Sequence, residues 1–272
     1  MEYNSELLRK VQEAELSILE DVKKVCEENG LTYFAIGGTN LGALRHNGFI
    51  PWDDDIDIAM MRDDYNKFLE IAPSKLPESL VVQHFSTDPN AAVYFIKVRR
   101  KGTLFVEPGR KHTKMNHGVF IDIMPFDYVT TDEKELRKYR RGARFWKELY
   151  ISKNVAVITA NCKPIIKILG TIYRCVSHIL LMPVSKRWLF DKYDQHIQKY
   201  NSEVSELISS RGEEANEWPY NDVFPVRAHP FENTEIMVPK NAEKVLEIQF
   251  GDWKKLPPED QRVNHMPLEI KL

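Results

Sequence analysis

Cysteine is scarce in this chain, which has three in 272 residues. Cys26, Cys162 and Cys175 lie far apart and form no C-x-x-C pair, so neither a zinc site nor a disulfide framework is expected. We expect reduced, mostly buried thiols. With 43% hydrophobic and 29% charged side chains, a chain of this length can bury a sizeable core, as one domain or one domain with a large insertion.

Long hydrophobic runs are also absent. Residues 1–6 contain no basic patch followed by an apolar stretch, so we expect no secretory signal and a cytoplasmic location. The most apolar segment, 164–182, is interrupted by Lys167 and Arg174 and falls short of the roughly 20 apolar residues that a spanning helix needs. Such a segment is either a helix lying on a membrane surface or a buried helical insertion, and the sequence leaves both open.

The net charge is small, at −2, but it is unevenly distributed. Residues 134–200 hold 15 Lys and Arg against four acids, a local charge of +11, which leaves −13 for the rest of the chain. This pattern indicates either a basic surface for an anionic partner or a solvated helix face. We predict a peripheral contact of 134–200 with the inner membrane face and a lipid-linked or polyanionic acceptor, and we expect no nucleic acid partner.

Four aspartates fall within five residues, at Asp53, Asp54, Asp55 and Asp57. These carboxylates repel one another unless a cation or basic groups compensate, and the alternative is a solvated acidic loop. Alternation over 55–60 places Asp55 and Asp57 on one face of a predicted strand. A calcium-binding loop is excluded, because its sixth position needs glycine and this chain has isoleucine there.

A further acid, Asp122, stands alone among apolar residues in the predicted strand 119–124. Hard divalent cations prefer carboxylate oxygens, with water and substrate phosphates completing their shell. We therefore predict that Asp55, Asp57 and Asp122 are the catalytic, metal-binding residues, holding Mg²⁺ (or Mn²⁺). Asp53 and Asp54 are then expected on the substrate side.

A glycine pair, Gly37 and Gly38, ends the predicted strand 31–36 and leaves room for phosphate oxygens beside its backbone N–H groups. Thr39 is predicted to cap a short helix over 39–46, whose N-terminus favours anions. These three residues are expected to bind the nucleotide of the substrate.

Basic residues near these elements are candidates for holding phosphate charge. We favour Arg45, Lys97 and Arg99, because each follows an apolar element that positions it, although ordinary surface charge is the alternative. His117 precedes Gly118 and is either a proton-transfer group or a structural histidine.

The order of elements predicts an α+β fold with a mixed sheet flanked by helices. An amphipathic helix leads to Gly30, a basic helix covers 132–150, and helix 241–250 follows strand 235–238. We divide the chain into a catalytic core at 1–130, a basic helical segment at 131–215 and a C-terminal part at 216–272 that packs back on the core.

The run Gly37–Asp57 closely resembles the signature of the LicD family, which comprises bacterial phosphocholine transferases related to fukutin-type enzymes of glycan assembly. Further matches are residues 118–127, residues 238–241 and residues 250–258. The resemblance spans nearly the whole chain and is weakest at 134–215. A motif of 21 residues is far more specific than a bare Asp-x-Asp pair.

This resemblance implies a nucleotidyltransferase-like fold and a magnesium-dependent transfer of phosphocholine from CDP-choline to a sugar hydroxyl of teichoic acid, lipopolysaccharide or capsule. The family's site residues correspond to Asp55, Asp57 and Asp122. Choline would need an aromatic pocket, for which Trp52, Tyr94, Phe126 and Trp253 are candidates, although each also suits the core. Two alternatives stay open: transfer from another CDP-activated donor such as CDP-glycerol, and a nucleotide-binding regulator without turnover.

Overall fold

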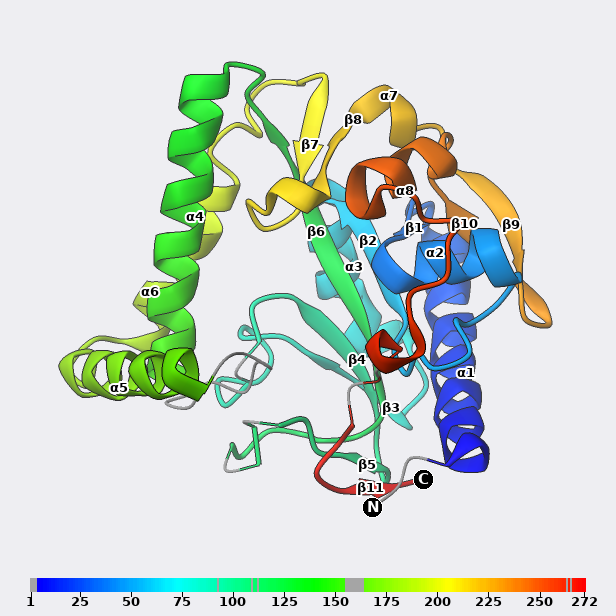
Figure 1. Cartoon of the computed structure of the whole chain (residues 1–272), viewed down its shortest axis with the longest axis horizontal. Helices are drawn as coiled ribbons and strands as arrows, with labels where there is room; N and C mark the ends of the chain where they lie inside the picture. The colour runs from blue at the N-terminus through cyan, green and yellow to red at the C-terminus, as the bar shows by residue number, and fades with distance from the viewer. Residues whose placement is uncertain are drawn as a thin grey trace.

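A mixed β-sheet forms the centre of the molecule. The computed structural model describes residues 4–91, 93–108, 110–111, 113–154, 164–262, 264 and 266–272. In this part the sheet has seven strands, with the order β1-β2-β6-β4-β3 and with β7 and β8 continuing from β6 (Figure 1). These strands are β1 (Phe34–Ala35), β2 (Asp57–Met61), β3 (Leu80–Gln83), β4 (Ile96–Arg100), β6 (Phe120–Val129), β7 (Leu207–Ser209) and β8 (Glu217–Pro219).

Strand direction in this sheet is mixed, because β2 and β6 run parallel while the other neighbours are antiparallel. Two small antiparallel pairs join β9 (Arg227–Phe231) to β10 (Thr234–Val238), and β5 (Leu104–Phe105) to β11 (Ile270–Lys271). The predicted α+β class with a mixed sheet is therefore confirmed.

Helices flank the sheet and form a separate layer beside it. They are α1 (Ser5–Asn29), α2 (Gly37–His46), α3 (Arg62–Lys75), α4 (Glu133–Asn154), α5 (Pro164–Leu180), α6 (Lys186–Ile197), α7 (Tyr220–Val223) and α8 (Ala242–Phe250), with short 3₁₀ turns at Glu214–Asn216 and Glu259–Gln261. Figure 1 shows α4 and α6 side by side to the left of the sheet, with α5 projecting outward at their lower end.

One face of the sheet is buried beneath α1 and α3. Val22 of α1 and Phe68 of α3 belong to the same buried cluster as Ile58 of β2 and Ile121 of β6. Because strand side chains alternate between faces, the residues next to these, Asp57 and Asp122, point to the opposite face. The core thus leaves the acidic face of the sheet available for chemistry.

The helices that the apolar periodicity predicted are confirmed, because a 3.6-residue repeat over many residues depends little on distant contacts. Gly30 ends α1 in the left-handed region, at φ 64°. The predicted strand over 31–36 is shorter, at Phe34–Ala35.

The expectation that Thr39 caps a helix is wrong. Helix α2 begins two residues earlier, at Gly37, after an N-cap residue, Ile36, that offers no side-chain acceptor. The Thr39 hydroxyl instead accepts the backbone N–H of Asp57 at 2.8 Å. It therefore ties α2 to the start of β2.

The remaining expectations concern thiols and membranes. Cys26 is buried and Cys175 is exposed, and Cys162 lies outside the described residues. In the described part of the chain, the helices are all too short or too polar to cross a membrane.

Candidate active site

A row of three charged residues crosses the open face of the sheet. Asp57 at the start of β2 is the register partner of Asp122 on the parallel strand β6, and Asp122 is in turn the partner of Lys97 on β4. Directly opposed residues on neighbouring strands share a face and lie side by side. The structure thus brings together three residues that the sequence separates by up to 65 positions, and all three were predicted site residues.

Asp57 is held in place from two directions. Its backbone N–H donates to the Thr39 hydroxyl, and its carbonyl accepts the N–H of Ile36, which is the residue before α2. Gly37 opens that helix at φ 56°, and a Cβ there would stand 3.5 Å from Asp57 Oδ2. A side chain at position 37 would therefore strain the backbone, while its Cβ would only touch the carboxylate at an ordinary contact distance.

Asp122 forms an ion pair with Lys97. The Lys97 ammonium donates to both carboxylate oxygens at 2.7 and 3.0 Å, lies 3.4 Å from Glu107 Oε1, and sits over the ring of Phe120. Burial lowers the pKa of Lys97 and raises the pKa of Asp122, while their mutual attraction opposes both shifts. The two short hydrogen bonds describe a charged pair beneath the cavity.

The ionised form of Asp57 is destabilised at this position. Burial raises the pKa of Asp57 well above its ordinary value, and the carboxylates of Asp55 and Asp122 raise it further, whereas Arg211 and Lys97 oppose the shift. A site that desolvates a carboxylate beside others of the same sign gains from any cation that joins it. The row therefore offers carboxylates whose charge a bound cation would stabilise.

A cavity of about 740 Å³ opens above the row. Its charged lining has both signs: the acids are Asp54, Asp55, Asp57, Asp122 and Glu107. The bases are Lys97, Arg110, Arg174 and Arg211. Aromatic side chains complete part of the wall, namely Tyr94, Phe95, Phe105 and Phe120. A space of this size and polarity suits a nucleotide-sized anion that also carries a cationic or neutral head group.

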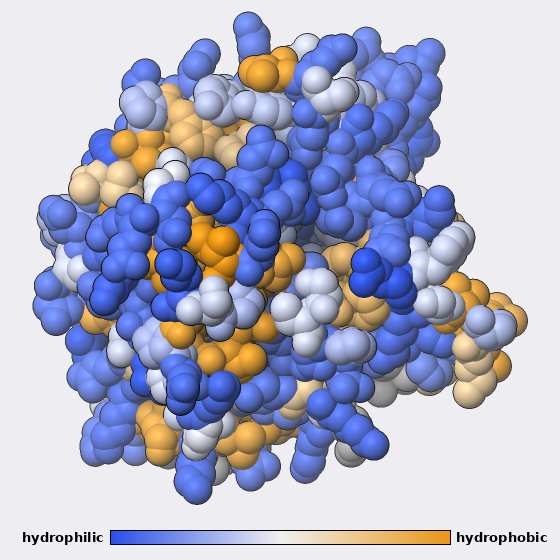
Figure 2. All heavy atoms as spheres, turned by 180° about the vertical axis from the view of Figure 1, so that it is seen from behind, coloured by the Kyte–Doolittle hydropathy of each residue, from blue (hydrophilic) through white to orange (hydrophobic). Residues whose placement is uncertain are grey.

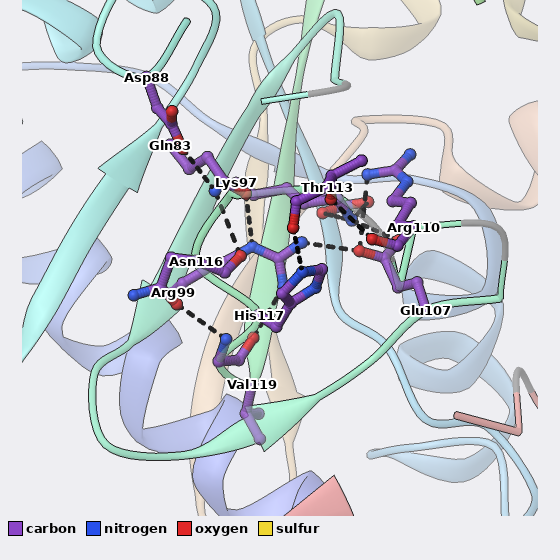
Figure 3. Close-up of polar contacts among 12 residues, drawn as sticks. Gln83, Asp88, Lys97, Arg99, Glu107, Arg110, Thr113, Asn116, His117 and Val119 are labelled. Carbon is purple, nitrogen blue, oxygen red and sulfur yellow. Dashed lines mark hydrogen bonds and ion pairs between the residues drawn. The ribbon is translucent and has the colours of Figure 1, made fainter. Parts of the chain in front are cut away.

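Arg99 is buried behind the cavity and does not line it. Its guanidinium donates to Gln83 Oε1 at 2.6 Å, to the Gly118 carbonyl at 2.8 Å and to Glu107 Oε2 at 2.7 Å. Figure 3 shows Arg99 and Arg110 both directed at Glu107. Arg99 thus fixes Glu107 next to Lys97. It lies behind the cavity and not at the phosphate-binding position that was predicted for it.

Glu107 is the acid at the centre of this network. Although burial raises the pKa of its carboxyl, the positive charges of Lys97, Arg110 and Arg99 lower it well below its usual range. The negative charge of Glu107 lies 3.4 Å from the Lys97 ammonium and opposes the lowering of the Lys97 pKa by burial.

Two other predicted residues lie away from the cavity wall. Arg45 donates to the Trp253 carbonyl at 2.9 Å and to His46 at 3.0 Å. Trp52 lies under the guanidinium of Arg262, which is 5.2 Å from its ring centre. Neither residue is among the described cavity-lining side chains.

The remaining predicted residues surround Asp57. Asp54 is buried, at 1% exposure, and lines the cavity with Asp55. A Cβ on Gly38 would collide with Asp53 Oδ2, so glycine at this position makes room for the Asp53 carboxylate at the start of α2. An acid beside a helix N-terminus interacts favourably with the helix dipole.

Among the aromatic candidates for a choline pocket, Tyr94 lines the cavity. Phe126 and Trp253 belong to buried apolar clusters instead. His117 lies in the polar network of Figure 3, where its Nε2 donates to the Thr113 carbonyl at 3.1 Å. A carbonyl only accepts, so this nitrogen carries a proton, and the contact fits the structural interpretation of His117.

Several charged residues of the site escaped the sequence analysis. Arg211 is held by Glu213 at 2.9 Å, lies 5.7 Å from the centre of the Phe95 ring and has φ 61°. Glu15 of α1 is 1% exposed, and burial raises its pKa together with the charges of Asp55, Asp54 and Asp53. The one local signal was the Arg211-Gly212 pair, which is typical of a turn with positive φ and says nothing about a site.

Comparison with known proteins relates this site to a family. Residues 30–155 match the family model described as LicD/FKTN/FKRP, nucleotidyltransferase domain. Over 268 residues, which are 95% of this chain and 96% of the relative, the sequence is 27% identical to the lipopolysaccharide cholinephosphotransferase LicD of Haemophilus influenzae. An uncharacterized protein of Rickettsia typhi is 31% identical over 126 residues, which are 46% of this chain and 38% of that protein.

Residues 30–155 are thus similar to the nucleotidyltransferase domain of the LicD family, and most of the chain is similar to LicD of Haemophilus influenzae. The resemblance that the sequence motifs indicated is thereby confirmed, and the matched region contains Asp57, Asp122 and Lys97. Arg174 and Arg211 lie outside the region matched by the family model but line the cavity.

The side chains around the cavity show which residues could hold a metal ion. Among the described residues, no three carboxylate, imidazole or thiolate groups form a finished metal cluster, and Asp122 is engaged by Lys97. Asp55 and Asp57 do line one cavity, and they offer hard oxygen donors in a place where burial opposes their charge. These two residues fit a magnesium-type cation, which would also need oxygen ligands from outside the protein.

Proposed function

We propose that this protein transfers phosphocholine from CDP-choline to a hydroxyl of a cell-surface glycan, such as teichoic acid, lipopolysaccharide or capsule, and releases CMP. The named activity of the Haemophilus influenzae relative supports this proposal, because the match extends over nearly the full length of both chains. The observation that carries it is the row Asp57, Asp122 and Lys97 beneath a cavity with acids and bases on its walls.

The charges of the cavity are suited to a nucleotide diphosphate. Lys97, Arg110 and Arg211 offer positive charge to phosphate oxygens, with guanidinium groups able to bind two oxygens at once. The choline cation suits the part of the lining that carries Tyr94, since aromatic faces attract quaternary ammonium groups. In this proposal the phosphate end of phosphocholine binds to basic side chains, and the choline end binds to an aromatic side chain.

The fold supports a nucleotidyltransferase-like core as part of the same proposal. Parallel strands β2 and β6 present one acid each, and α2 begins beside them with two glycines. If the chain is divided after residues 130 and 215, as we propose, β7 belongs to the basic segment and β8 to the C-terminal part. Both of these segments would then contribute a strand to the central sheet.

The proposed reaction is a direct displacement at phosphorus. The acceptor oxygen bonds to the phosphorus atom that carries choline, the bond from that phosphorus to the CMP oxygen breaks, and the hydroxyl proton is lost. A magnesium ion held by Asp55 and Asp57, with Asp122 as the third proposed ligand, would neutralise phosphate charge when bound. Lys97 positions Asp122, and Glu107 forms a second ion pair with Lys97.

Because the donor is a nucleotide, we place the reaction on the cytoplasmic side of the membrane.

Donor competition tests the proposal. The protein is incubated with magnesium, a glycan acceptor and either CDP-choline or CDP-glycerol, and CMP release is followed. We expect faster release from CDP-choline. Faster release from CDP-glycerol would instead support another alditol phosphate as the transferred group, and binding of either donor without CMP release would indicate a regulator without turnover.

A further inference from the structure

Helix α5 exposes an apolar face to solvent. Eight of its hydrophobic side chains are between 50% and 71% exposed, and they recur at steps of one, three or four residues: Ile165, Ile168, Leu169, Ile172, Tyr173, Val176, Ile179 and Leu180. At 3.6 residues per turn these positions cover an arc of about 140°. The described part of α5 is therefore amphipathic, with its apolar side facing outward.

Two polar residues of α5, Arg174 and His178, face the protein instead. Arg174 Nη2 lies 3.4 Å from Glu148 Oε2 of α4, and His178 Nδ1 donates to the Ser152 carbonyl at 3.1 Å. A helix on the surface of a globular protein normally turns its apolar side toward the core. The reverse orientation of α5 marks a binding surface, because exposed apolar patches of this continuity are rare on monomeric proteins.

The position of α5 suits contact with a broad surface. Figure 1 shows the helix projecting from the lower end of α4, and in Figure 2 hydrophobic residues gather on this projecting part of the molecule. Its 17 residues span about 26 Å, too short to cross a bilayer and long enough to lie along one.

Charge favours an anionic bilayer over a second copy of the chain as the occupant. Residues 134–200 carry +11, so two copies facing each other through this region would repel, whereas acidic lipid head groups would be attracted. On α6, Arg187 is 64% exposed and Trp188 is 47% exposed, with the Lys192 ammonium 5.9 Å from the Trp188 ring centre. Basic and aromatic residues of this kind accompany helices that lie at membrane surfaces.

We propose that the outward face of α5 binds an anionic membrane surface, with the helix lying in the plane of the bilayer. Arg174 joins this face to the cavity, because it belongs to α5 and also lines the cavity wall. Membrane binding therefore holds the cavity beside an acceptor anchored in the same membrane. This last step rests on the proposed function, whereas the membrane contact itself does not.

Flotation with vesicles tests the contact without requiring activity. Purified full-length protein is mixed with phosphatidylcholine vesicles that contain or lack phosphatidylglycerol. We expect the protein to float with the anionic vesicles, and the double variant Ile168→Asn, Ile172→Asn to show about tenfold weaker partition, because less apolar surface enters the interface. Both side chains are exposed, so the variant should keep its circular dichroism spectrum and melting temperature.

The matched control is the double variant Val204→Asn, Ile248→Asn, which removes exposed apolar side chains from elsewhere (82% and 43% exposed) without changing charge. It should partition like the wild type. The proposal is overturned if the wild type stays unbound with anionic vesicles, if both double variants bind equally well, or if light scattering shows a dimer that only Ile168→Asn, Ile172→Asn disrupts. CMP release with a water-soluble acceptor is measured separately, and its absence would count against the proposed function alone.

Discussion

At the scale of single residues, strand register decides which charged groups can act together. Lys97 reaches Asp122 because β4 and β6 pair at that position, and a shift by one residue would turn Lys97 toward the buried helices. Two positions further along β4, Arg99 shares the same face but contacts Gln83, Gly118 and Glu107 instead. Two neighbouring basic residues thus have different roles, one at the cavity and one behind it.

His84 provides a residue-scale prediction about acid stability. Burial, together with the charges of Arg62 and Arg187, lowers the pKa of His84 from 6.5 to about 4. Its Nδ1 accepts the N–H of Ser86 at 3.2 Å, so the folded protein holds the neutral ring. The unfolded chain binds a proton below pH 6.5 while the folded chain does not, so stability is full above pH 6.5 and falls toward pH 4.

Urea unfolding at several pH values measures this effect. Between pH 7 and pH 4 the wild type should lose about 3 kcal/mol more of its unfolding free energy than His84→Asn does, since each pKa unit corresponds to about 1.4 kcal/mol. Asparagine keeps an acceptor near the Ser86 N–H and cannot take a proton in this range. An equal loss in both proteins across these pH values would contradict the prediction.

At the scale of elements, a buried ion pair connects the sheet to the helical layer. Arg62 at the start of α3 binds both carboxylate oxygens of Asp127 on β6 at 2.8 and 2.7 Å, and it also donates to Asp194 of α6 at 3.1 Å. The side chains of Arg62 and Asp127 are 7% and 0% exposed. Removing one partner leaves a buried charge without its counter-ion.

We expect Arg62→Met to lower the unfolding free energy by about 3 kcal/mol, because Asp127 would lose its buried cation. The control Arg187→Met breaks a pair with Asp191 in which both side chains are exposed, and its cost should stay below about 1 kcal/mol. Chemical denaturation of the three proteins gives both values. Similar losses in the two variants would show that the Arg62 contacts do not hold the layers together.

The elements differ in how far the sequence determines them. Helices α1, α4, α5 and α8 were predicted because their apolar repeats are local. The alternation around Asp57 correctly indicated a strand, although β2 starts at Asp57 itself and Asp55 precedes it. The start of α2 was misplaced, since the Thr39 hydroxyl binds β2, and no local pattern contains that partner.

The candidate site was predicted in part for the same reason. Asp54, Asp55, Asp57, Asp122 and Lys97 were proposed from motifs, and all of them line the cavity. The cationic wall formed by Arg110, Arg174 and Arg211 was missed, because it is assembled by packing between distant segments. A sequence motif indicates residues that act in the same chemistry. Residues on opposite walls of a cavity come from distant segments and share no sequence pattern.

At the scale of the whole molecule, the cavity joins the sheet to the helical layer. Its acids come from β2 and β6 with the loops beside them, and its bases include Arg174 of α5 and Arg211 near β7. Helix α5 therefore connects two surfaces, the cavity on its inner side and the exposed apolar face on its outer side. Membrane contact and donor binding would be organised by the same layer.

The most direct measurement is CMP release from CDP-choline, with magnesium and a glycan acceptor, by the wild type and by Asp57→Asn. The wild type should release CMP, and the variant should be slower by about a hundredfold or more, because it lacks a carboxylate that, in our proposal, would hold the magnesium ion. The control Asp252→Asn changes an exposed acid and should match the wild type. Equal CMP release by Asp57→Asn and the wild type would contradict the assignment of the active site to this row.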